Sequence, residues 1–175
     1  MLAVVLAGCG GGHPAATTST STPPSTSAAP ATTTITITLS PQAATVLAAY
    51  RAEQAAFQIA EHTANAYLPA LAATMTGGQL QSVRRFLVAD KAAGIIGQGP
   101  VRLHPHVVSI HGDQAVVRDC LFSGLELIYA KTGKPVPPIT PPEHDGVQAN
   151  LVQVSAGVWK VYHQHVTEGS CPPGY

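Results

Sequence analysis

Between residues 40 and 93, apolar side chains recur every three or four positions, which predicts helices. The first apolar stripe consists of Val46, Tyr50, Phe57, Ala64, Leu68 and Leu71. Ser40 followed by Pro41 is typical of a helix start, and Pro69 requires this helix to end or kink near Tyr67. Gly77 and Gly78 are expected to stop the helical segment, and a second helix is predicted over residues 79–93.

After Pro100 the apolar period becomes two, which is typical of strands. Residues 101–110 and 114–122 predict a hairpin, and the alternative that its second strand runs on to Tyr129 stays open. Residues 131–146 form a proline-rich loop, and residues 147–154 and 158–166 predict a second hairpin. Two or three helices followed by four antiparallel strands indicate an α+β domain whose helices cover one face of the sheet.

Charge separates the chain into two parts. The 175 residues include nine Lys or Arg and nine Asp or Glu, so the net charge is zero, and only 10% of the residues are charged, against about 25% in ordinary domains. No charged side chain precedes Arg51. Nucleic-acid binding needs a clustered basic surface, so we expect no nucleic-acid partner. No apolar run reaches the length of a membrane span.

The segment Leu6-Ala7-Gly8-Cys9 ends a short apolar run and resembles the lipobox of bacterial lipoproteins. The resemblance implies that residues 1–8 are a signal peptide segment and that the Cys9 thiol is diacylated, with palmitate-type chains. Two acyl chains give stable membrane anchoring. Only eight residues precede Cys9, none of them basic, so we expect part of the signal to lie upstream of this start. The alternative is an unmodified Cys9 in a run of small residues.

Residues 9–39 predict a disordered stalk. From Gly10 to Leu39 there are fourteen Ser or Thr, four Pro and no charged side chain. Such a segment buries too little apolar surface to offset the entropy of ordering it. We therefore expect a linker that holds a folded domain, residues 40–175, away from the membrane at the extracytoplasmic face of the cell envelope.

Short motifs in the folded part suggest a family. They are Leu68-Pro69-Ala70-Leu71, Thr76-Gly77-Gly78-Gln79-Leu80, Asp119-Cys120, Thr132-Gly133-Lys134 and Val158-Trp159-Lys160-Val161. In this order they resemble actinobacterial lipoproteins with a nuclear-transport-factor-2-like domain, over roughly residues 41–171. The resemblance implies a curved antiparallel sheet of four or more strands wrapped around helices, which makes a cone with a pocket at its open end. Phe122 stands where such proteins often have a second Asp.

With Cys9 acylated, Cys120 and Cys171 remain. An even number of cysteines in an exported domain predicts a structural disulfide between them. The alternative is a reactive thiol pair, although the spacing is not Cys-x-x-Cys.

Two histidine pairs, His104 with His106 and His163 with His165, alternate along predicted strands, so each pair projects from one face. If the first and last strands were neighbours, the four imidazoles would converge as zinc or copper ligands. His111 or Asp119 would then be a further ligand. The alternative is that these are exposed or half-buried strand residues, and no other cofactor is expected.

The pocket is expected to involve aromatic and imidazole side chains from the first helix and the last strand. These are Trp159, His163, His165, Tyr50 and Phe57. Trp159 is predicted to share a strand face with Val161 and His163 and to pack on the first helix.

These observations favour a non-catalytic, membrane-anchored lipoprotein that binds a cell-envelope protein or a small apolar ligand. A metal-binding lipoprotein is the second hypothesis. A small isomerase or dehydratase is the third, because relatives of this fold use an Asp or a His–Asp dyad, which Asp119 with His163 or His165 would supply.

Overall fold

Helices precede strands along the chain, as predicted. The computed structural model describes residues 39–139 and 141–171, which belong to the compact unit Ile37–Tyr175. The helices are α1 (Pro41–Glu61), α2 (Pro69–Thr74) and α3 (Gly77–Ala93). The strands are β1 (Ile95–Gln98), β2 (Val101–Arg102), β3 (His106–His111), β4 (Gln114–Ser123), β5 (Glu126–Tyr129), β6 (Glu143–Ser155) and β7 (Val158–Thr167).

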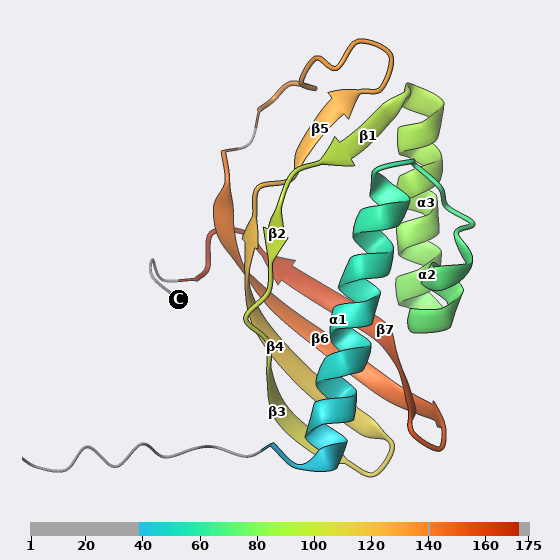
Figure 1. The fold of residues 1–175 in the computed structure, drawn as a ribbon, viewed down its shortest axis with the longest axis vertical. Coiled ribbons are helices and arrows are strands. Elements are labelled where there is room, and N and C mark those ends of the chain that lie inside the picture. The colour runs from blue at the N-terminus through green and yellow to red at the C-terminus, as the bar shows by residue number, and fades with distance from the viewer. Residues whose placement is uncertain (1–38, 140, 172–175) are drawn as a thin grey trace, which may run out of the picture. The chain divides into compact units, whose positions relative to one another are not determined.

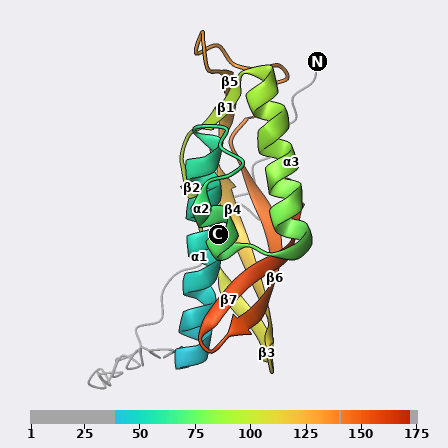
Figure 2. The ribbon, with the colours of Figure 1, turned by 90° about the vertical axis from the view of Figure 1, so that its right-hand side faces the viewer.

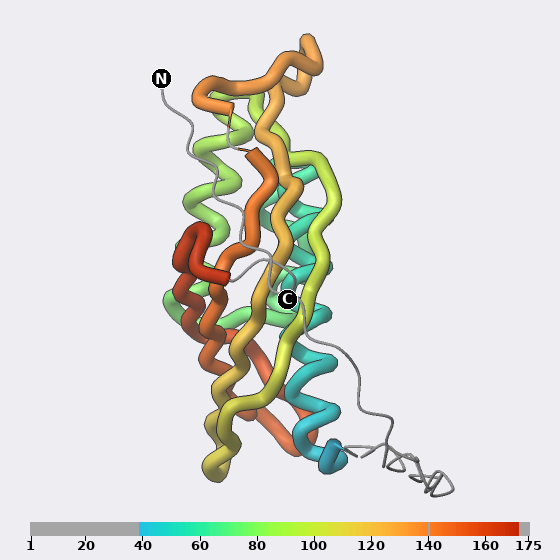
Figure 3. The backbone as a smooth tube through the Cα atoms, turned by 90° about the vertical axis from the view of Figure 1, so that its left-hand side faces the viewer, coloured from blue at the N-terminus to red at the C-terminus, as the bar shows by residue number. Residues whose placement is uncertain are grey.

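The main sheet has the order β2-β4-β6-β7, and β3 pairs with β4 beside β2. All of its described pairings are antiparallel. The helices lie on one face of this sheet (Figures 1 and 2), and Figure 3 shows the other face with the strands in front of the helices. The predicted α+β class is therefore confirmed, with a second, two-stranded sheet of β1 and β5 that the sequence did not predict.

The α1 helix begins where the sequence predicts. The Ser40 hydroxyl accepts a hydrogen bond from the Ala43 amide at 3.2 Å, and Pro41 is the first helical residue. The helix ends at Glu61, earlier than expected, because Ala64 turns the chain with a positive φ of 46°. The amide of Asn65 then bonds back to the Ala60 carbonyl, and Ala64 is buried, so tertiary packing holds this turn.

A glycine lies at each end of α3, whereas the sequence pattern predicts Gly77 only as the stop of the preceding helical segment. Gly77 is the first residue of the helix, which corrects the prediction that it ends a helical segment. Gly94 ends the helix with a φ of 69°, the left-handed conformation that glycine adopts without strain.

The strand boundaries differ from the prediction where the chain changes sheets. The expected strand 101–110 is divided into β2 and β3, both paired with β4. The possible continuation of β4 to Tyr129 is instead β5, which pairs with β1 after Gly124. An added Cβ at Gly124 would lie 3.1 Å from the Pro100 ring, so the chain turns here in a tight space. The second predicted hairpin is confirmed as β6 and β7, with β6 beginning earlier, at Glu143.

A bulge in β7 changes which positions point inward: odd-numbered residues do so before it and even-numbered residues after it. Leu151 pairs with Val161 and Asn150 with His163, so Tyr162 is the extra residue. Before the bulge Trp159 and Val161 point into the core, whereas beyond it Gln164 lines the interior.

Buried side chains form two clusters that share α1. Val46, Leu47 and Tyr50 pack on the inner face of the main sheet, in a cluster with Trp159 and Val161. Further along α1, Ala56 and Ala60 pack against α2 and α3 in a second cluster. The middle of α1 therefore passes from a sheet contact to a helix contact.

The expected signal segment, Cys9 and nearly all of the stalk lie outside the described residues. No helix within residues 39–139 and 141–171 has the length and apolar character to cross a membrane.

Candidate functional site

A cavity of about 240 Å³ lies between α1, α3 and the inner face of the main sheet. One wall consists of polar residues of α1, and the opposite wall comes from β4, β6 and β7. Apolar side chains make most of the remaining surface. The lining residues are Glu53, Gln54, Phe57, Gln58, Glu61, Gln79, Val83, Val101, Leu121, Ser123, Leu125, Asp145, Val147, Gln164 and Val166.

Glu53 is the most deeply buried carboxyl of this cavity, with 1% of its surface exposed. Its Oε2 accepts a hydrogen bond from Gln54 Nε2 at 2.9 Å, and the Gln79 side chain also bonds to it. Gln54 Nε2 in turn donates to Gln164 Oε1 at 3.1 Å, so this network joins α1 to β7. Burial raises the pKa of Glu53 to about 7, against the opposing effect of the two amide donors.

Glu61 lies at the end of α1, with 2% of its surface exposed. Its Oε2 atom has no hydrogen-bond partner among the described residues. Burial, and then the nearby charge of Asp90, raise the pKa of Glu61 to about 8. Gly97 of β1 leaves room for this carboxyl, since an added Cβ there would lie 3.0 Å from Glu61 Cδ.

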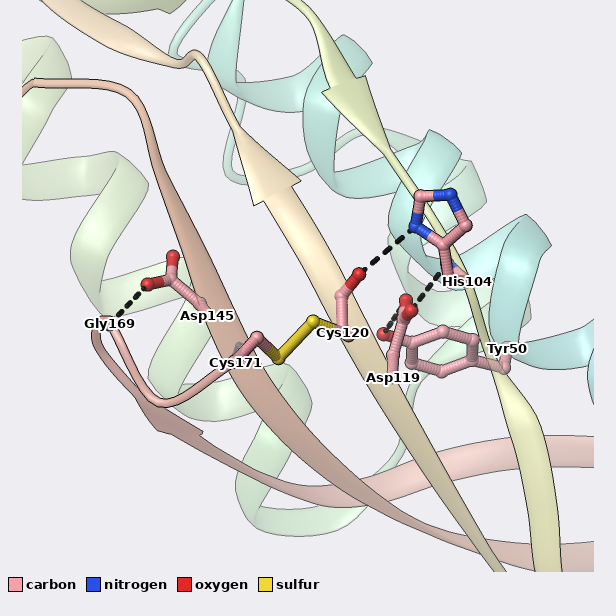
Figure 4. Close-up of a disulfide and its surroundings, with 7 residues drawn as sticks. All are labelled: Tyr50, His104, Asp119, Cys120, Asp145, Gly169 and Cys171. Atoms are coloured by element: carbon pink, nitrogen blue, oxygen red, sulfur yellow. Dashed lines mark hydrogen bonds between the residues drawn. A yellow bond between two sulfur atoms is a disulfide. The ribbon is translucent and has the colours of Figure 1, made fainter. Parts of the chain in front are cut away.

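Asp145 brings a third carboxyl to the lining, from β6. Its Oδ1 accepts a hydrogen bond from the Gly169 amide at 3.1 Å (Figure 4). The cavity therefore has carboxyls on two facing elements, α1 and β6.

Tyr50 and Asp119 form a second buried polar pair, which does not contact the cavity. The Tyr50 hydroxyl donates to Asp119 Oδ2 at 2.9 Å, and the His104 amide donates to Asp119 Oδ1 at 2.6 Å (Figure 4). Burial raises the pKa of Asp119, although these two donors oppose the rise. Burial and the neighbouring Asp119 also raise the pKa of Tyr50 far above its ordinary value.

The predicted disulfide between Cys120 and Cys171 is confirmed, with the two Cα atoms 5.8 Å apart (Figure 4). Cys120 points to the outer face of the sheet, opposite the helices. Gly146, which pairs with Cys120 across the sheet, leaves space for Ser170. The disulfide therefore fixes the C-terminal segment against the outer face.

The two histidine pairs do not converge. His106 lies on β3 and His165 on β7, and β4 and β6 separate these two strands. His104 Nδ1 instead contacts the Cys120 carbonyl oxygen at 3.2 Å. The four-histidine metal site requires the histidine-bearing strands to be neighbours, and in the described sheet they are not. No group of three or more His, Cys, Asp or Glu suited to a metal ion occurs within residues 39–139 and 141–171.

The predicted pocket residues separate as well. Phe57 lines the cavity, whereas Tyr50 and Trp159 are buried in the core cluster on the sheet. The prediction that Trp159 and His163 share a face is wrong, because the bulge at Tyr162 reverses the alternation. His163 and His165 are exposed, and a His–Asp dyad with Asp119 does not form, since Asp119 points inward.

A second hollow, of about 350 Å³, lies on the outer face beside the disulfide. It is more open than the interior cavity, and its lining includes His106, Arg118 and His165. The interior cavity is the better candidate site, because its carboxyls are buried and its polar groups converge from several elements.

Sequence reasoning missed Glu53, Glu61 and Gln164. The apolar stripe of α1 contained a signal for the first two, because Glu53 lies three residues after Tyr50 and Glu61 four residues after Phe57. These positions place both carboxyls near the buried face. No comparable signal indicated Gln164, whose direction depends on the bulge.

Comparison with known proteins supports the fold. No model of a known protein family matches the chain, and no curated protein matches it in sequence. A ketosteroid isomerase-like protein from Erwinia carotovora atroseptica SCRI1043 matches in structure with a TM-score of 0.50 and 17% sequence identity, over 76% of this chain and 100% of that chain. The domain has a nuclear-transport-factor-2-like fold. The intermembrane space region of the chloroplast protein ARC6 matches with a TM-score of 0.52 and 14% identity, over 72% of this chain and 96% of that one.

At these identities the nuclear-transport-factor-2-like fold is shared, and nothing further about activity follows. In this nuclear-transport-factor-2-like domain the cavity lies between the helices and the inner face of the sheet, so its side chains must indicate its chemistry.

Proposed function

We propose that this chain is a lipid-anchored, extracytoplasmic protein of the cell envelope whose domain binds a small ligand in the interior cavity. The cavity itself carries this proposal: buried polar groups from α1 and β6 and half-buried ones from α3 and β7 converge on a largely apolar space. Binding without catalysis is the simplest use of such a site.

The proposed location is supported by the sequence and by the disulfide. The lipobox-like segment ending at Cys9 would supply the anchor, and residues 10–39 would supply the stalk. The bond between Cys120 and Cys171 is typical of proteins that fold in an oxidising compartment. Mass spectrometry of the membrane fraction should find a diacylated Cys9, and an unmodified thiol there would contradict the anchor.

Ligand binding is tested with 1-hexanol as a probe and the full chain carrying Cys9→Ser. In nuclear magnetic resonance spectra, the side-chain amide signals of Gln54 and Gln164 should shift and saturate as the probe is added. Val166→Phe would fill the cavity and abolish these shifts. Val154→Phe is the matched control, because Val154 is 48% exposed against 46% for Val166 but does not line the cavity.

Absence of saturable shifts at millimolar hexanol and with its charged six-carbon analogues, in a chain that remains folded, would contradict small-ligand binding and favour a protein partner. Equal loss of binding in both valine variants would show that the shifts do not report on the cavity.

A second candidate function is acid–base catalysis of the isomerase or dehydratase type. The observation that favours it is Glu53, a carboxyl inside the cavity whose pKa burial raises to about 7, where it exchanges protons readily near neutral pH. A Glu53→Gln variant that binds a ligand but no longer converts it would support this candidate.

A further inference from the structure

The ionisable side chains that line the interior cavity are all acidic. They are Glu53 and Glu61 from α1 and Asp145 from β6, and among the described lining residues there is no Lys, Arg or His. Three carboxyls without a lining cation make the cavity unfavourable for an anionic ligand, because the lining offers no opposite charge and repels the ligand wherever a carboxyl is ionised.

The three carboxyls differ in their partners. Glu53 accepts from the Gln54 side chain, and Asp145 accepts from the Gly169 amide. Glu61 Oε2 has no donor within the described residues, although Glu61 is almost fully buried. A buried acceptor without a donor is destabilising, so a ligand that supplies a donor there gains the interaction that the protein leaves open.

We propose that the ligand of this cavity is a small organic cation, an ammonium group on a short apolar body, with Glu61 as its carboxylate counter-ion. This inference rests on the proposed ligand-binding function and specifies its substrate class. An ammonium carries three donors and no acceptor, which suits a wall of carboxyl and amide oxygens. The apolar lining, including Phe57, Val83 and Val166, would cover the hydrocarbon part.

The size of the cavity limits the ligand. Its volume of about 240 Å³ is below the roughly 300–1,000 Å³ of pockets that take drug-sized molecules. A short alkylammonium, which has one charged end and one apolar end, is small enough for a cavity of this volume.

Protonation of the empty site is consistent with this chemistry. Burial and Asp90 on α3 raise the pKa of Glu61 to about 8, so without a ligand the carboxyl is largely protonated at neutral pH. An ammonium in contact favours the charged carboxylate, and the proton then leaves to the solvent. Glu53 and Asp145 are the other ionisable groups that face the same space.

The experiment compares three probes of one chain length: n-hexylammonium, 1-hexanol and hexanoate. Each is titrated calorimetrically into the full chain carrying Cys9→Ser, and then into the same chain with Glu61→Gln added. Glu168→Gln is the matched control, because it removes an exposed carboxyl that does not line the cavity. Thermal melting verifies that each variant is folded.

Hexylammonium should bind more tightly than hexanol, and hexanoate should bind least. Glu61→Gln should weaken hexylammonium binding about tenfold or more, as expected for the loss of a charged hydrogen bond, and leave hexanol binding nearly unchanged. Glu168→Gln should change neither probe.

Tighter binding of hexanol than of hexylammonium would overturn the cation inference while leaving small-ligand binding intact. Retention of the ammonium preference in folded Glu61→Gln would overturn the role of Glu61. Absence of binding by every probe would contradict the proposed function itself. If Glu61→Gln does not fold, the order of the three affinities in the parent chain decides between these outcomes.

Discussion

At the scale of single residues, one hydrogen bond joins α1 to β4 inside the core. The Tyr50 hydroxyl is fully buried and donates to Asp119, which also holds the His104 amide. Asp119 thus has a donor on each carboxylate oxygen, and these donors explain how a carboxyl is tolerated at the centre of the sheet.

Tyr50→Phe removes the hydroxyl and leaves Asp119 Oδ2 without its donor. The free energy of unfolding should fall by about 1–3 kcal/mol, the usual cost of a buried polar group left unsatisfied. Urea denaturation measures this change. Tyr162→Phe is the control, because Tyr162 is exposed and makes no side-chain hydrogen bond to the described residues, so it should have almost no effect. Equal effects of both substitutions would contradict a structural role for the Tyr50 bond.

Individual residues also show how far the sequence predicts the site. The burial of Glu53 follows from its place in the apolar stripe of α1. Its chemistry does not follow, because the network through Gln54 depends on Gln164, which is 110 positions away from Gln54. Pairing of Cys120 with Cys171 was predictable, since these are the two cysteines of residues 40–175 and each therefore has one possible intramolecular partner there.

At the scale of elements, the disulfide connects the middle strand β4 with the segment that follows β7. The two cysteines are 51 positions apart, and the loop that they close runs through β5, β6 and β7. The disulfide therefore restrains the unfolded chain across half of the main sheet.

Replacing both cysteines, Cys120→Ser with Cys171→Ser, should lower the free energy of unfolding by at most about 4 kcal/mol, the chain-entropy value for a loop of this size. Urea denaturation with and without a reducing agent measures the effect. The reductant should destabilise the parent chain and leave the double variant unchanged. A parent chain that is indifferent to reductant while both thiols become titratable would contradict this stabilising role.

Elements with a regular period were predictable, and those that depend on tertiary pairing were not. The helices α1 and α3 and the hairpin of β6 and β7 follow from periodicity and capping residues. The pairing of β1 with β5 involves short segments of four residues each, for which periodicity carries little information. The face of the sheet from which His163 and His165 project also depends on the bulge. Nothing in the local sequence marks Tyr162 as the extra residue of that bulge.

At the scale of the whole domain, the zero net charge conceals a separation between the two faces of the sheet. The carboxyls of Glu53, Glu61 and Asp145 face the interior cavity. On the outer face, cross-strand pairing places His106, Arg118, Gln148 and His165 in one row. The cavity side thus has three carboxyls, whereas this row on the outer face has one arginine and two histidines.

The buried carboxyls should make the domain less stable as pH rises. In the unfolded chain Glu53 and Glu61 titrate near 4.5, whereas burial raises their folded pKa values to about 7 and about 8. Between pH 4.5 and 8 the folded state therefore binds more protons than the unfolded state. A tenfold change in proton affinity corresponds to about 1.4 kcal/mol. Stability is full below this window and should decline across it by several kcal/mol.

Urea denaturation at pH 5 and pH 8.5 tests this linkage, with Glu61→Gln as the comparison. The variant has one raised carboxyl fewer, so its stability should decline less between the two pH values. An identical decline in the parent chain and in folded Glu61→Gln would contradict the assignment to Glu61.

The bulge at Tyr162 sets which side chains of β7 reach the interior. Deleting Tyr162 would join Val161 directly to His163, so regular alternation would still leave Gln164 and Val166 inward and both histidines outward. Straightening the bulge with Tyr162 kept would instead turn His163 and His165 inward, toward the cavity carboxyls. The interior should therefore tolerate the loss of this one residue, whereas a one-residue change of register would place two imidazoles among the carboxyls.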